Sequence, residues 1–203
     1  CDLDAIRTVR SRGIFMEHAA PEGSGAMSAV LGMDAAVIED VLNGREGVSI
    51  ANYNCPGQIV ITGEADAVAE AGTVLKEAGA RRVLPLKVSG PFHSPMMRPA
   101  GEELAKVFAR VSMNPLKIPY VANINAEVIT DCGRIEGLLV EQVSGSVRWQ
   151  QSVETMIREG VDTFVEIGPG KTLTGFLRKI DKNVKAYHIG SWEEAVQVCE
   201  ELK

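Results

Sequence analysis

The sequence lacks the features that mark several large classes of protein. No apolar run approaches the roughly 20 residues of a membrane-spanning helix, and no segment resembles a signal peptide. The cysteines Cys1, Cys55, Cys132 and Cys199 are scattered and form neither a CxxC pair nor a metal-binding spacing. Basic residues are in deficit, with 21 Lys and Arg against 27 Asp and Glu. These absences argue against a membrane protein, a metal site and a nucleic-acid partner, and they favour a cytoplasmic protein with reduced thiols.

What is present is the composition of a globular protein. The chain has 203 residues, 45% of them hydrophobic, which is enough for one core or for a core with a small subdomain. Between 26 and 89 the apolar spacing predicts the order β-α-β-β-α-β, which is the ferredoxin-like pattern. The predicted segments are strand 26–33, helix 34–43, strands 48–54 and 58–63, helix 65–80 and strand 81–89.

The rest of the chain alternates helices and strands, which is typical of an α/β sheet protein. A helix over 2–19 places an apolar stripe on one side, made of Leu3, Ile6, Val9, Gly13 and Met16. After the helix that follows His93, the predicted segments are strand 117–129, helix 134–143, helix 149–160, strand 162–168, helix 171–180, strand 184–190 and helix 191–203. The strand 162–168 is almost continuously apolar, as buried parallel strands are. The last helix has its own apolar face, formed by Trp192, Ala195, Val196, Cys199 and Leu202.

One of the three histidines stands where a general base could act. His93 links the strand-like run RVLPLKVS to a helix, with Ser94 and Pro95 as its N-cap and first residue, although Pro99 leaves a later start open. The positive end of a helix dipole favours the neutral imidazole, the form that accepts a proton. The spacing also fits a hydrogen-bonded polar residue at a strand end with no catalytic role.

Four further residues are candidates or lie close to one. Arg12 lies along the apolar stripe of the first helix, so its guanidinium is expected to be partly buried and to need an anion, either a carboxylate of the protein or one of a substrate. A side chain that extends to the solvent is the third possibility. Asn54 and Gln58 flank the turn CPG and fit either hairpin chemistry or ligand contact. From spacing alone, Gln142 is a surface residue near a helix end.

A phosphate-binding loop is suggested by GKT at 170–172, directly after a predicted strand. The Walker pattern requires glycine five positions before the glycine of GKT, and that position is Val165. Pro169 also removes one N–H group that would bind phosphate. A tight turn between a strand and a helix is the better interpretation.

Several segments together resemble the malonyl-CoA:acyl carrier protein transacylase family, the acyltransferases of fatty acid and polyketide synthesis. The matching segments are RGIFM at 12–16, PEGSGAM at 21–27, NYNCPGQIVITG at 52–63, SGPFHSPMM at 89–97, PYVANINAEVI at 119–129, SVRWQQSV at 146–153 and VEIGPGKTLTG at 165–175, with the residues around Gln142. They follow the family's order over nearly the whole chain. The resemblance implies an α/β-hydrolase-like body, residues 1–25 and 89–203, with an inserted ferredoxin-like βαββαβ subdomain at 26–88.

The resemblance also implies roles for individual residues. His93 matches the base that activates a serine nucleophile, and Gln142 matches the residue whose main-chain carbonyl orients that base. Arg12 matches the arginine that pairs with the free carboxylate of the malonyl group. Phe92 resembles the residue that accompanies malonyl selectivity. Asn54 and Gln58 lie in the matching segment NYNCPGQIVITG and are expected to contact substrate.

Two parts of the family pattern are missing. No GxSxG motif, which would carry the serine nucleophile, and no GQGSQ loop, which helps to form the oxyanion hole, occur in the 203 residues. The resemblance therefore implies the C-terminal portion of a transacylase, inactive by itself.

The intact protein would transfer malonyl from malonyl-CoA to the phosphopantetheine thiol of an acyl carrier protein by a Ser-His ping-pong reaction in fatty acid biosynthesis, with no metal or cofactor of its own. An acidic carrier protein would dock on a basic patch, and two groups of basic residues are candidates if they are not simply solvated. The two groups are Arg81, Arg82 and Lys87, and Arg178, Lys179, Lys182 and Lys185. The alternatives are a polyketide-type acyltransferase with another acyl specificity and a non-catalytic fragment that binds a carrier protein or ligand.

Overall fold

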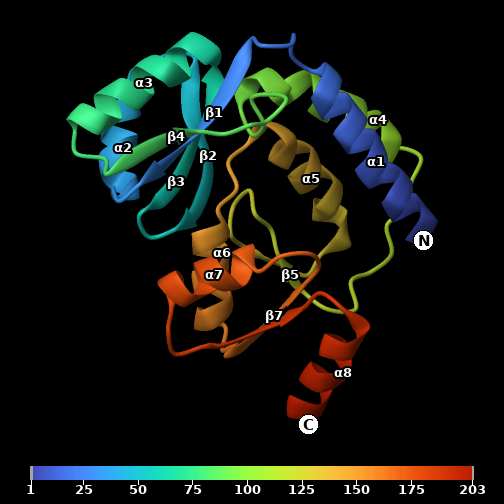
Figure 1. The fold of residues 1–203 in the computed structure, drawn as a ribbon. Helices are drawn as coiled ribbons and strands as arrows, with labels where there is room; N and C mark the ends of the chain where they lie inside the picture. The colour runs from blue at the N-terminus through green and yellow to red at the C-terminus, as the bar shows by residue number, and fades with distance from the viewer. Residues whose placement is uncertain (1, 203) are drawn as a thin grey trace.

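The computed structural model describes residues 2–202 of the chain (Figure 1). The Cys1 thiol and the outer limits of the predicted body at 1 and 203 lie outside the described residues. The elements gather in two groups, a four-stranded sheet with its helices and a set of helices with two small sheets. The three cysteines among residues 2–202, which are Cys55, Cys132 and Cys199, are free thiols. No helix in this range is long and apolar enough to cross a membrane.

The predicted order β-α-β-β-α-β is confirmed. Its elements are β1 (Gly25–Leu31), α2 (Ala35–Leu42), β2 (Val48–Cys55), β3 (Gln58–Glu64), α3 (Ala65–Glu77) and β4 (Arg82–Pro85). The strands form one antiparallel sheet in the order β2-β3-β1-β4. The last strand covers only four residues of the predicted 81–89, and Leu86 adds one further hydrogen bond, from its N–H to the Met27 carbonyl at 2.9 Å.

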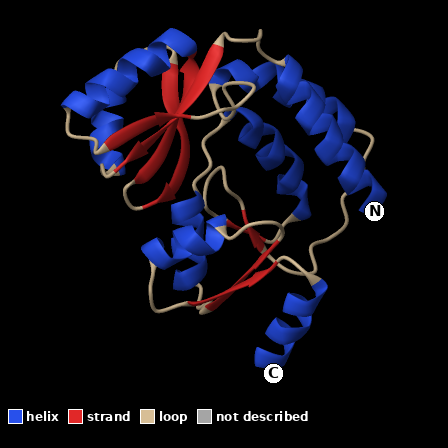
Figure 2. Cartoon of the chain, viewed as in Figure 1, coloured by secondary structure: helices blue, strands red, loops and turns tan. Residues whose placement is uncertain are grey.

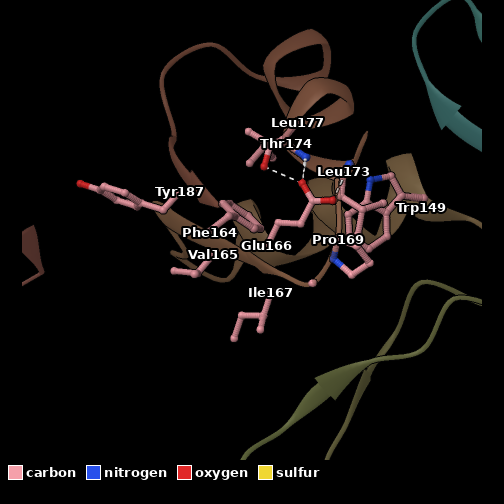
Figure 3. Close-up of a pocket in the computed structure, with 11 residues that line it drawn as sticks. Trp149, Phe164, Val165, Glu166, Ile167, Pro169, Leu173, Thr174, Leu177 and Tyr187 are labelled. Atoms are coloured by element: carbon pink, nitrogen blue, oxygen red, sulfur yellow. Dashed lines mark hydrogen bonds between the residues drawn. The ribbon is translucent and has the colours of Figure 1, made fainter. Parts of the chain in front are cut away.

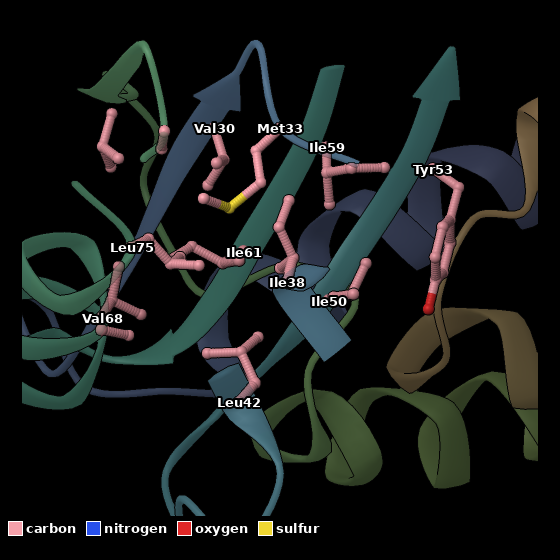
Figure 4. Close-up of a cluster of buried hydrophobic side chains, with 13 residues drawn as sticks. Val30, Met33, Ile38, Leu42, Ile50, Tyr53, Ile59, Ile61, Val68 and Leu75 are labelled. Carbon is pink, nitrogen blue, oxygen red and sulfur yellow. The ribbon is translucent and has the colours of Figure 1, made fainter. Parts of the chain in front are cut away.

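The alternation of side chains along the strands gives this sheet two apolar faces. One face packs against α2 and α3 (Figure 2). There Val30, Ile59 and Ile61 meet Ile38 and Leu75 (Figure 4). All five are at most 1% exposed. The other face carries a smaller cluster of Met27, Ala29, Ala51 and Val60, and Phe92 packs against it. The sheet therefore joins its own helices on one side and the His93 segment on the other.

The helical group is built on α1 (Asp2–His18), a 3₁₀ turn η1 (Pro95–Met97), α4 (Arg98–Phe108), a second turn η2 (Cys132–Arg134) and α5 (Ile135–Ser144). Its core contains Met16 of α1, Met97, Leu104 and Phe108 of the α4 region, and Val143 of α5. The first half of the apolar stripe on α1 faces the solvent, because Leu3, Ile6 and Val9 are 61%, 65% and 70% exposed. The buried apolar contacts between α1 and the α4 region come from the end of α1, at Phe15 and Met16.

The predicted strand 117–129 is wrong. The chain instead forms a short antiparallel hairpin of β5 (Tyr120–Val121) and β6 (Val128–Ile129). The cause is local turn chemistry, because the Asn125 side chain accepts the N–H of Glu127 and Ala126 adopts a left-handed φ of 58°. These bonds reverse the chain where the apolar pattern suggested continuous extension.

The C-terminal elements are α6 (Trp149–Arg158), β7 (Thr163–Ile167), α7 (Thr172–Ile180), β8 (Lys185–Ile189) and α8 (Trp192–Glu201). β7 and β8 pair in parallel, as the sequence predicts, but β7 is not buried, and Ile167 is 78% exposed. The predicted apolar face of α8 is also exposed, with Trp192 at 78%. Within residues 2–202 this sheet has only these two strands, and most of their side chains are half-buried. Figure 1 shows α8 extending away from the other elements.

Candidate active site

His93 occupies a strained turn between β4 and η1. Its φ is +60°, a left-handed conformation that non-glycine residues rarely adopt and that is often found at functional sites. The buried Ser94 stabilises the turn, because its hydroxyl donates to the Pro91 carbonyl at 2.7 Å and accepts the N–H of Met96 at 3.3 Å. Ser94 is thus the N-cap that the sequence predicts, although the α-helix begins later, at Arg98.

The imidazole of His93 is oriented by main-chain carbonyls. Its Nδ1 lies 3.0 Å from the Gln142 carbonyl oxygen and 3.2 Å from the Gly145 carbonyl oxygen. Because both partners are acceptors, the proton of the neutral ring belongs on Nδ1. Nε2 then carries the lone pair and is the atom that can accept a proton from another group.

The surroundings keep this histidine neutral. Burial lowers the pKa of His93 and is the largest influence, the hydrogen bond to the Gln142 carbonyl works against it, and the charge of Arg12 lowers the pKa further. The net pKa lies below the ordinary value of a histidine. The sequence predicts a neutral imidazole from the helix dipole, whereas the leading cause in the structure is desolvation.

Arg12 brings a cation close to His93. Its guanidinium is half-buried in α1, and burial lowers its pKa. Among residues 2–202 no hydrogen bond or ion pair is formed by this guanidinium, so the protein carboxylate considered as its partner is not found. A half-buried guanidinium without an anion is suited to bind one.

Phe92 anchors the loop of His93 from both sides. Its ring is half-buried and packs against the cluster of Met27, Ala29, Ala51 and Val60 on the sheet, and also against the helical core. The side chain next to His93 therefore bridges the two groups of elements, and the selectivity expected of Phe92 stays a prediction.

Asn54 and Gln58, the other predicted contacts, lie on the hairpin of β2 and β3. Asn54 is half-buried near the end of β2. The side-chain oxygen of Gln58 accepts a hydrogen bond from Lys179 of α7 at 3.2 Å. The hydrogen bond found for this side chain therefore goes to α7 and not to His93. The site thus brings His93, Gln142 and Arg12 together, while Gln58 joins the sheet to α7.

A separate apolar pocket of about 350 Å³ lies between β7, α7 and Trp149 (Figure 3). Its carboxylate, Glu166, accepts the N–H groups of Leu173 and Thr174 at 3.1 and 2.7 Å and the Thr174 hydroxyl at 2.7 Å. The N-terminus of α7 therefore already holds an anion. This arrangement favours the tight turn over a phosphate-binding loop at 170–172.

Gly145 and Ser146 are site residues that the sequence does not reveal. The Gly145 carbonyl is the second acceptor for His93, and the Ser146 hydroxyl donates to the Ile50 carbonyl at 2.6 Å. Every residue has a main-chain carbonyl, so the residue type does not show which carbonyl accepts a hydrogen bond from His93. The only sequence feature that points to this position is that the segment SGS directly follows the end of a predicted helix.

Comparison with known proteins places the chain among acyltransferases. The family model described as "Acyl transferase domain" matches residues 1–198. The malonyl CoA-acyl carrier protein transacylase of Bacillus subtilis is 44% identical over 204 residues, which covers 98% of this chain and 64% of that protein.

Two solved structures are similar as well. The malonyl CoA-acyl carrier protein transacylase of Clostridium perfringens has a TM-score of 0.93 at 40% identity, over 98% of this chain and 64% of that one. A type II PKS acyl-carrier protein in complex with its malonyl-transacylase gives a TM-score of 0.90 at 38% identity, over 97% of this chain and 65% of that one. The chain thus has a mixed α/β fold like theirs and spans 64% of the Bacillus relative's length. With 198 residues matched to the family model, the chain belongs to the acyl transferase domain family.

Proposed function

We propose that this chain provides the base and the carboxylate-binding residue of a malonyl-CoA:acyl carrier protein transacylase. The observation that carries the proposal is the geometry of His93, whose Nδ1 faces two carbonyls while its Nε2 is left to accept a proton, close to the unpaired guanidinium of Arg12. The names of the similar proteins support malonyl as the acyl group, CoA as its donor and an acyl carrier protein as its acceptor.

The proposed reaction has two halves with the same proton carrier. His93 Nε2 takes the proton of a serine hydroxyl as the serine oxygen attacks the malonyl thioester, and it returns the proton to the departing CoA sulfur. In the second half His93 takes the proton of the phosphopantetheine thiol, whose sulfur attacks the malonyl-serine ester, and then returns the proton to the serine. The two carbonyls at Nδ1 stabilise the imidazolium by hydrogen bonds alone, less strongly than a carboxylate would.

Arg12 is proposed to bind the free carboxylate of the malonyl group. Its planar guanidinium can donate two parallel hydrogen bonds to a carboxylate and so fix the direction of the acyl chain. An acetyl group would leave the half-buried cation unpaired, which favours malonyl over acetyl.

The serine is proposed to come from outside the 203 residues, because no GxSxG motif occurs in them. The chain by itself would then be inactive. We propose further that residues 26–88 are a ferredoxin-like subdomain inserted in an α/β-hydrolase-like body of residues 1–25 and 89–203. The strand order β2-β3-β1-β4 supports the first assignment and the parallel pair β7-β8 supports the second. A cytoplasmic location and a reaction without a metal or cofactor belong to the same proposal.

The function is tested in a longer protein that contains this chain and a GxSxG serine. His93→Ala is expected to lower the rate of malonyl transfer to a phosphopantetheinylated carrier protein by about 1,000-fold or more. His18→Ala, which removes an exposed histidine at the end of α1, is the matched control and should transfer at the parental rate. Transfer at the parental rate by His93→Ala would remove the proposed base.

A polyketide pathway is the second candidate, because one similar structure is described as a type II PKS carrier protein with its malonyl-transacylase. Competition among malonyl-, methylmalonyl- and acetyl-CoA, with fatty acid and polyketide carrier proteins as acceptors, separates the two. The binding alternative predicts that the chain alone binds the carrier protein while no serine-containing form transfers malonyl. The two groups of basic residues named above are the candidates for docking.

A further inference from the structure

The side chain of Gln142 lies behind the carbonyls that orient His93. Its Nε2 donates to the Gly145 carbonyl at 3.0 Å and to the Ser146 carbonyl at 3.3 Å. The Gly145 oxygen therefore accepts two hydrogen bonds, one from Gln142 and one from His93 Nδ1. The main chain of Gln142 supplies the other acceptor for the same nitrogen. One residue thus contacts the base directly through its backbone and indirectly through its amide.

The orientation of this amide is fixed by its partners. A flipped amide would place its oxygen against two carbonyl oxygens, so the NH₂ group must face Gly145 and Ser146. In this orientation Oε1 is buried and has no hydrogen-bond partner among the described residues. A buried acceptor without a donor is unfavourable. The favourable contribution of the Gln142 side chain therefore comes from the two hydrogen bonds that its NH₂ group donates.

The same segment is attached to the edge of the four-stranded sheet. The Ser146 hydroxyl donates to the Ile50 carbonyl at 2.6 Å, and the Val147 N–H donates to the Ala51 carbonyl at 2.7 Å. The Tyr53 N–H returns a bond to the Val147 carbonyl at 2.9 Å, which makes a parallel bridge between β2 and the segment. β2 has a register shift between Ile50 and Asn52, so Ala51 is an extra residue in its pairing with β3. Such a bulge frees a carbonyl to bond elsewhere.

Gly145 itself leaves little room for adjustment. A Cβ at this position would overlap the Ile124 side chain and approach the Glu141 carbonyl to 3.0 Å. The absence of a side chain lets the backbone run close to these groups while its carbonyl faces the histidine.

We propose that the Gln142 amide and the attachment of Ser146 and Val147 to β2 position the two acceptor carbonyls, so that the four-stranded sheet fixes the tautomer of His93. Gln142 and Ser146 are positioning residues that act through Gly145. The inference rests on the proposed function only where it concerns the rate of malonyl transfer. The tautomer of His93 is a property of the chain itself and can be measured without that function.

The first test reads the imidazole directly in the ¹⁵N-labelled chain. The sequence has three histidines, so His93→Gln assigns the signals of His93 by their loss. In the parent chain the ¹⁵N shifts should report a proton on Nδ1. In Gln142→Met, which keeps the size of the side chain and removes its donors, a mixture of the two tautomers and a lower pKa of His93 are expected.

Matched controls separate positioning from a general loss of structure. Gln197→Met removes another side-chain amide, on α8, which donates to Glu201, and Ser24→Ala removes a hydroxyl that donates to Pro21. Both should leave the His93 signals at their parental shifts. Ser146→Ala should shift the tautomer in the same direction as Gln142→Met but less, and it decides the test if Gln142→Met does not fold. A folded variant whose His93 tautomer and pKa match the parent, or whose pKa rises, overturns the proposal.

The second test measures the consequence in a longer, serine-containing form. Gln142→Met is expected to lower kcat roughly 10- to 100-fold with little change in KM, as misplacement of a catalytic group does. If the tautomer shifts while His93→Ala still transfers malonyl at the parental rate, the positioning inference stands and the proposed function fails. If His93→Ala abolishes transfer while Gln142→Met leaves the tautomer unchanged, the function stands and this inference fails.

Discussion

At the scale of single residues, the proposed chemistry of this chain rests on two side chains of different kinds. His93 is kept neutral by burial and by the charge of Arg12, and its ring is aimed by two carbonyl acceptors. Arg12 is half-buried, burial lowers its pKa, and it pairs with no carboxylate among the described residues. A neutral imidazole beside an unpaired cation suits a ligand that carries a negative charge.

Arg12→Ala tests the role of the cation. In a longer protein with its serine, the variant is expected to lose malonyl transfer by about 100-fold or more, because a site built for a charged group discriminates strongly against its absence. Acetyl transfer should persist or rise, since acetyl has no carboxylate to bind. Parallel assays with malonyl-CoA and acetyl-CoA measure the ratio of the two transfer rates. Arg10→Ala, which removes an exposed arginine on the same helix, is the control. Equal loss of both activities would contradict the carboxylate-binding role.

The lowered pKa of His93 also predicts how stability depends on pH. A histidine whose folded-state pKa lies below its unfolded value of 6.5 binds fewer protons in the folded state. Its contribution to the free energy of unfolding is complete above 6.5 and is lost as the pH falls toward the folded pKa. Urea titrations between pH 7.5 and about 5 should therefore show a decline in the parent that is smaller in His93→Gln. Identical pH profiles would show that the imidazole is not desolvated.

The sequence predicts the half-buried state of Arg12 and the neutral state of His93, but it does not predict the surroundings that cause them. The half-buried state of Arg12 follows from its place on the apolar stripe, yet Leu3, Ile6 and Val9 on that stripe face the solvent. The neutral state of His93 is predicted from a helix dipole, whereas burial dominates. The acceptor at Gly145 cannot be predicted, because a carbonyl belongs to every residue and only the fold decides which one is aimed at the histidine.

At the scale of elements, local patterns account for most helices and strands, and their failures have identifiable causes. The segment 117–129 contains apolar residues at strand spacing, but Asn125 closes a turn with Glu127 and divides it into β5 and β6. The apolar run of β7 predicts a parallel strand correctly and its burial incorrectly. Apolar composition favours burial, but the burial itself depends on what packs against the strand, and in the fold four residues of β7 are only half-buried and Ile167 is exposed.

The start of α7 shows how one side chain fixes a junction between elements. Glu166 at the end of β7 accepts two N–H groups and one hydroxyl from the first turn of α7. Burial works to raise the pKa of Glu166, but the hydrogen bonds from Thr174 and Leu173 outweigh it and leave this pKa below its ordinary value. The carboxylate thereby joins β7 to α7.

Glu166→Gln removes the charge and one strong acceptor from this junction. The free energy of unfolding is expected to fall by about 1 kcal/mol at pH 7, the usual size of a lost charge-assisted cap. Because the folded pKa is lowered, the contribution of Glu166 is present above its ordinary value of 4.5 and is lost below it. The difference in the free energy of unfolding between variant and parent, measured by urea titration, should shrink as the pH falls below 4.5. Glu22→Gln, at an exposed position outside the helices, is the control, and a difference that stays constant with pH would contradict the assignment.

At the scale of the whole molecule, the site depends on how the four-stranded sheet meets the helical group. Phe92 packs against both, and β2 holds the segment that carries the acceptor carbonyls. Sequence patterns predict each group separately but do not show which strand edge faces which helix end. The bridge from β2 to Val147 joins positions that are far apart in the sequence, and no periodicity encodes it. The resemblance to the transacylases anticipates that His93 and Gln142 meet, and the sheet edge that holds them together becomes visible only in the fold.

Gly25 and Pro91 mark the point where the segments entering and leaving the sheet touch. A Cβ on Gly25, at the start of β1, would overlap the ring of Pro91, which is buried two residues before His93. Gly25→Ala is therefore expected to lower the free energy of unfolding by about 2 kcal/mol, as overpacking of a tight contact does. The same change should shift the NMR signals of His93, since Pro91 accepts the hydroxyl of Ser94 in the same turn.

Gly137→Ala is the matched control, because the same glycine-to-alanine change is expected to raise the free energy of unfolding at this position. A Cβ at Gly137, inside α5, meets nothing within 4 Å, so alanine should stabilise the helix by roughly 0.5–1 kcal/mol and leave His93 unchanged. Thermal and urea unfolding of the two variants compare the effects directly. If Gly25→Ala is as stable as the parent and its His93 signals do not move, then the contact with Pro91 adjusts without disturbing the imidazole, and the tight contact does not contribute to the orientation of His93.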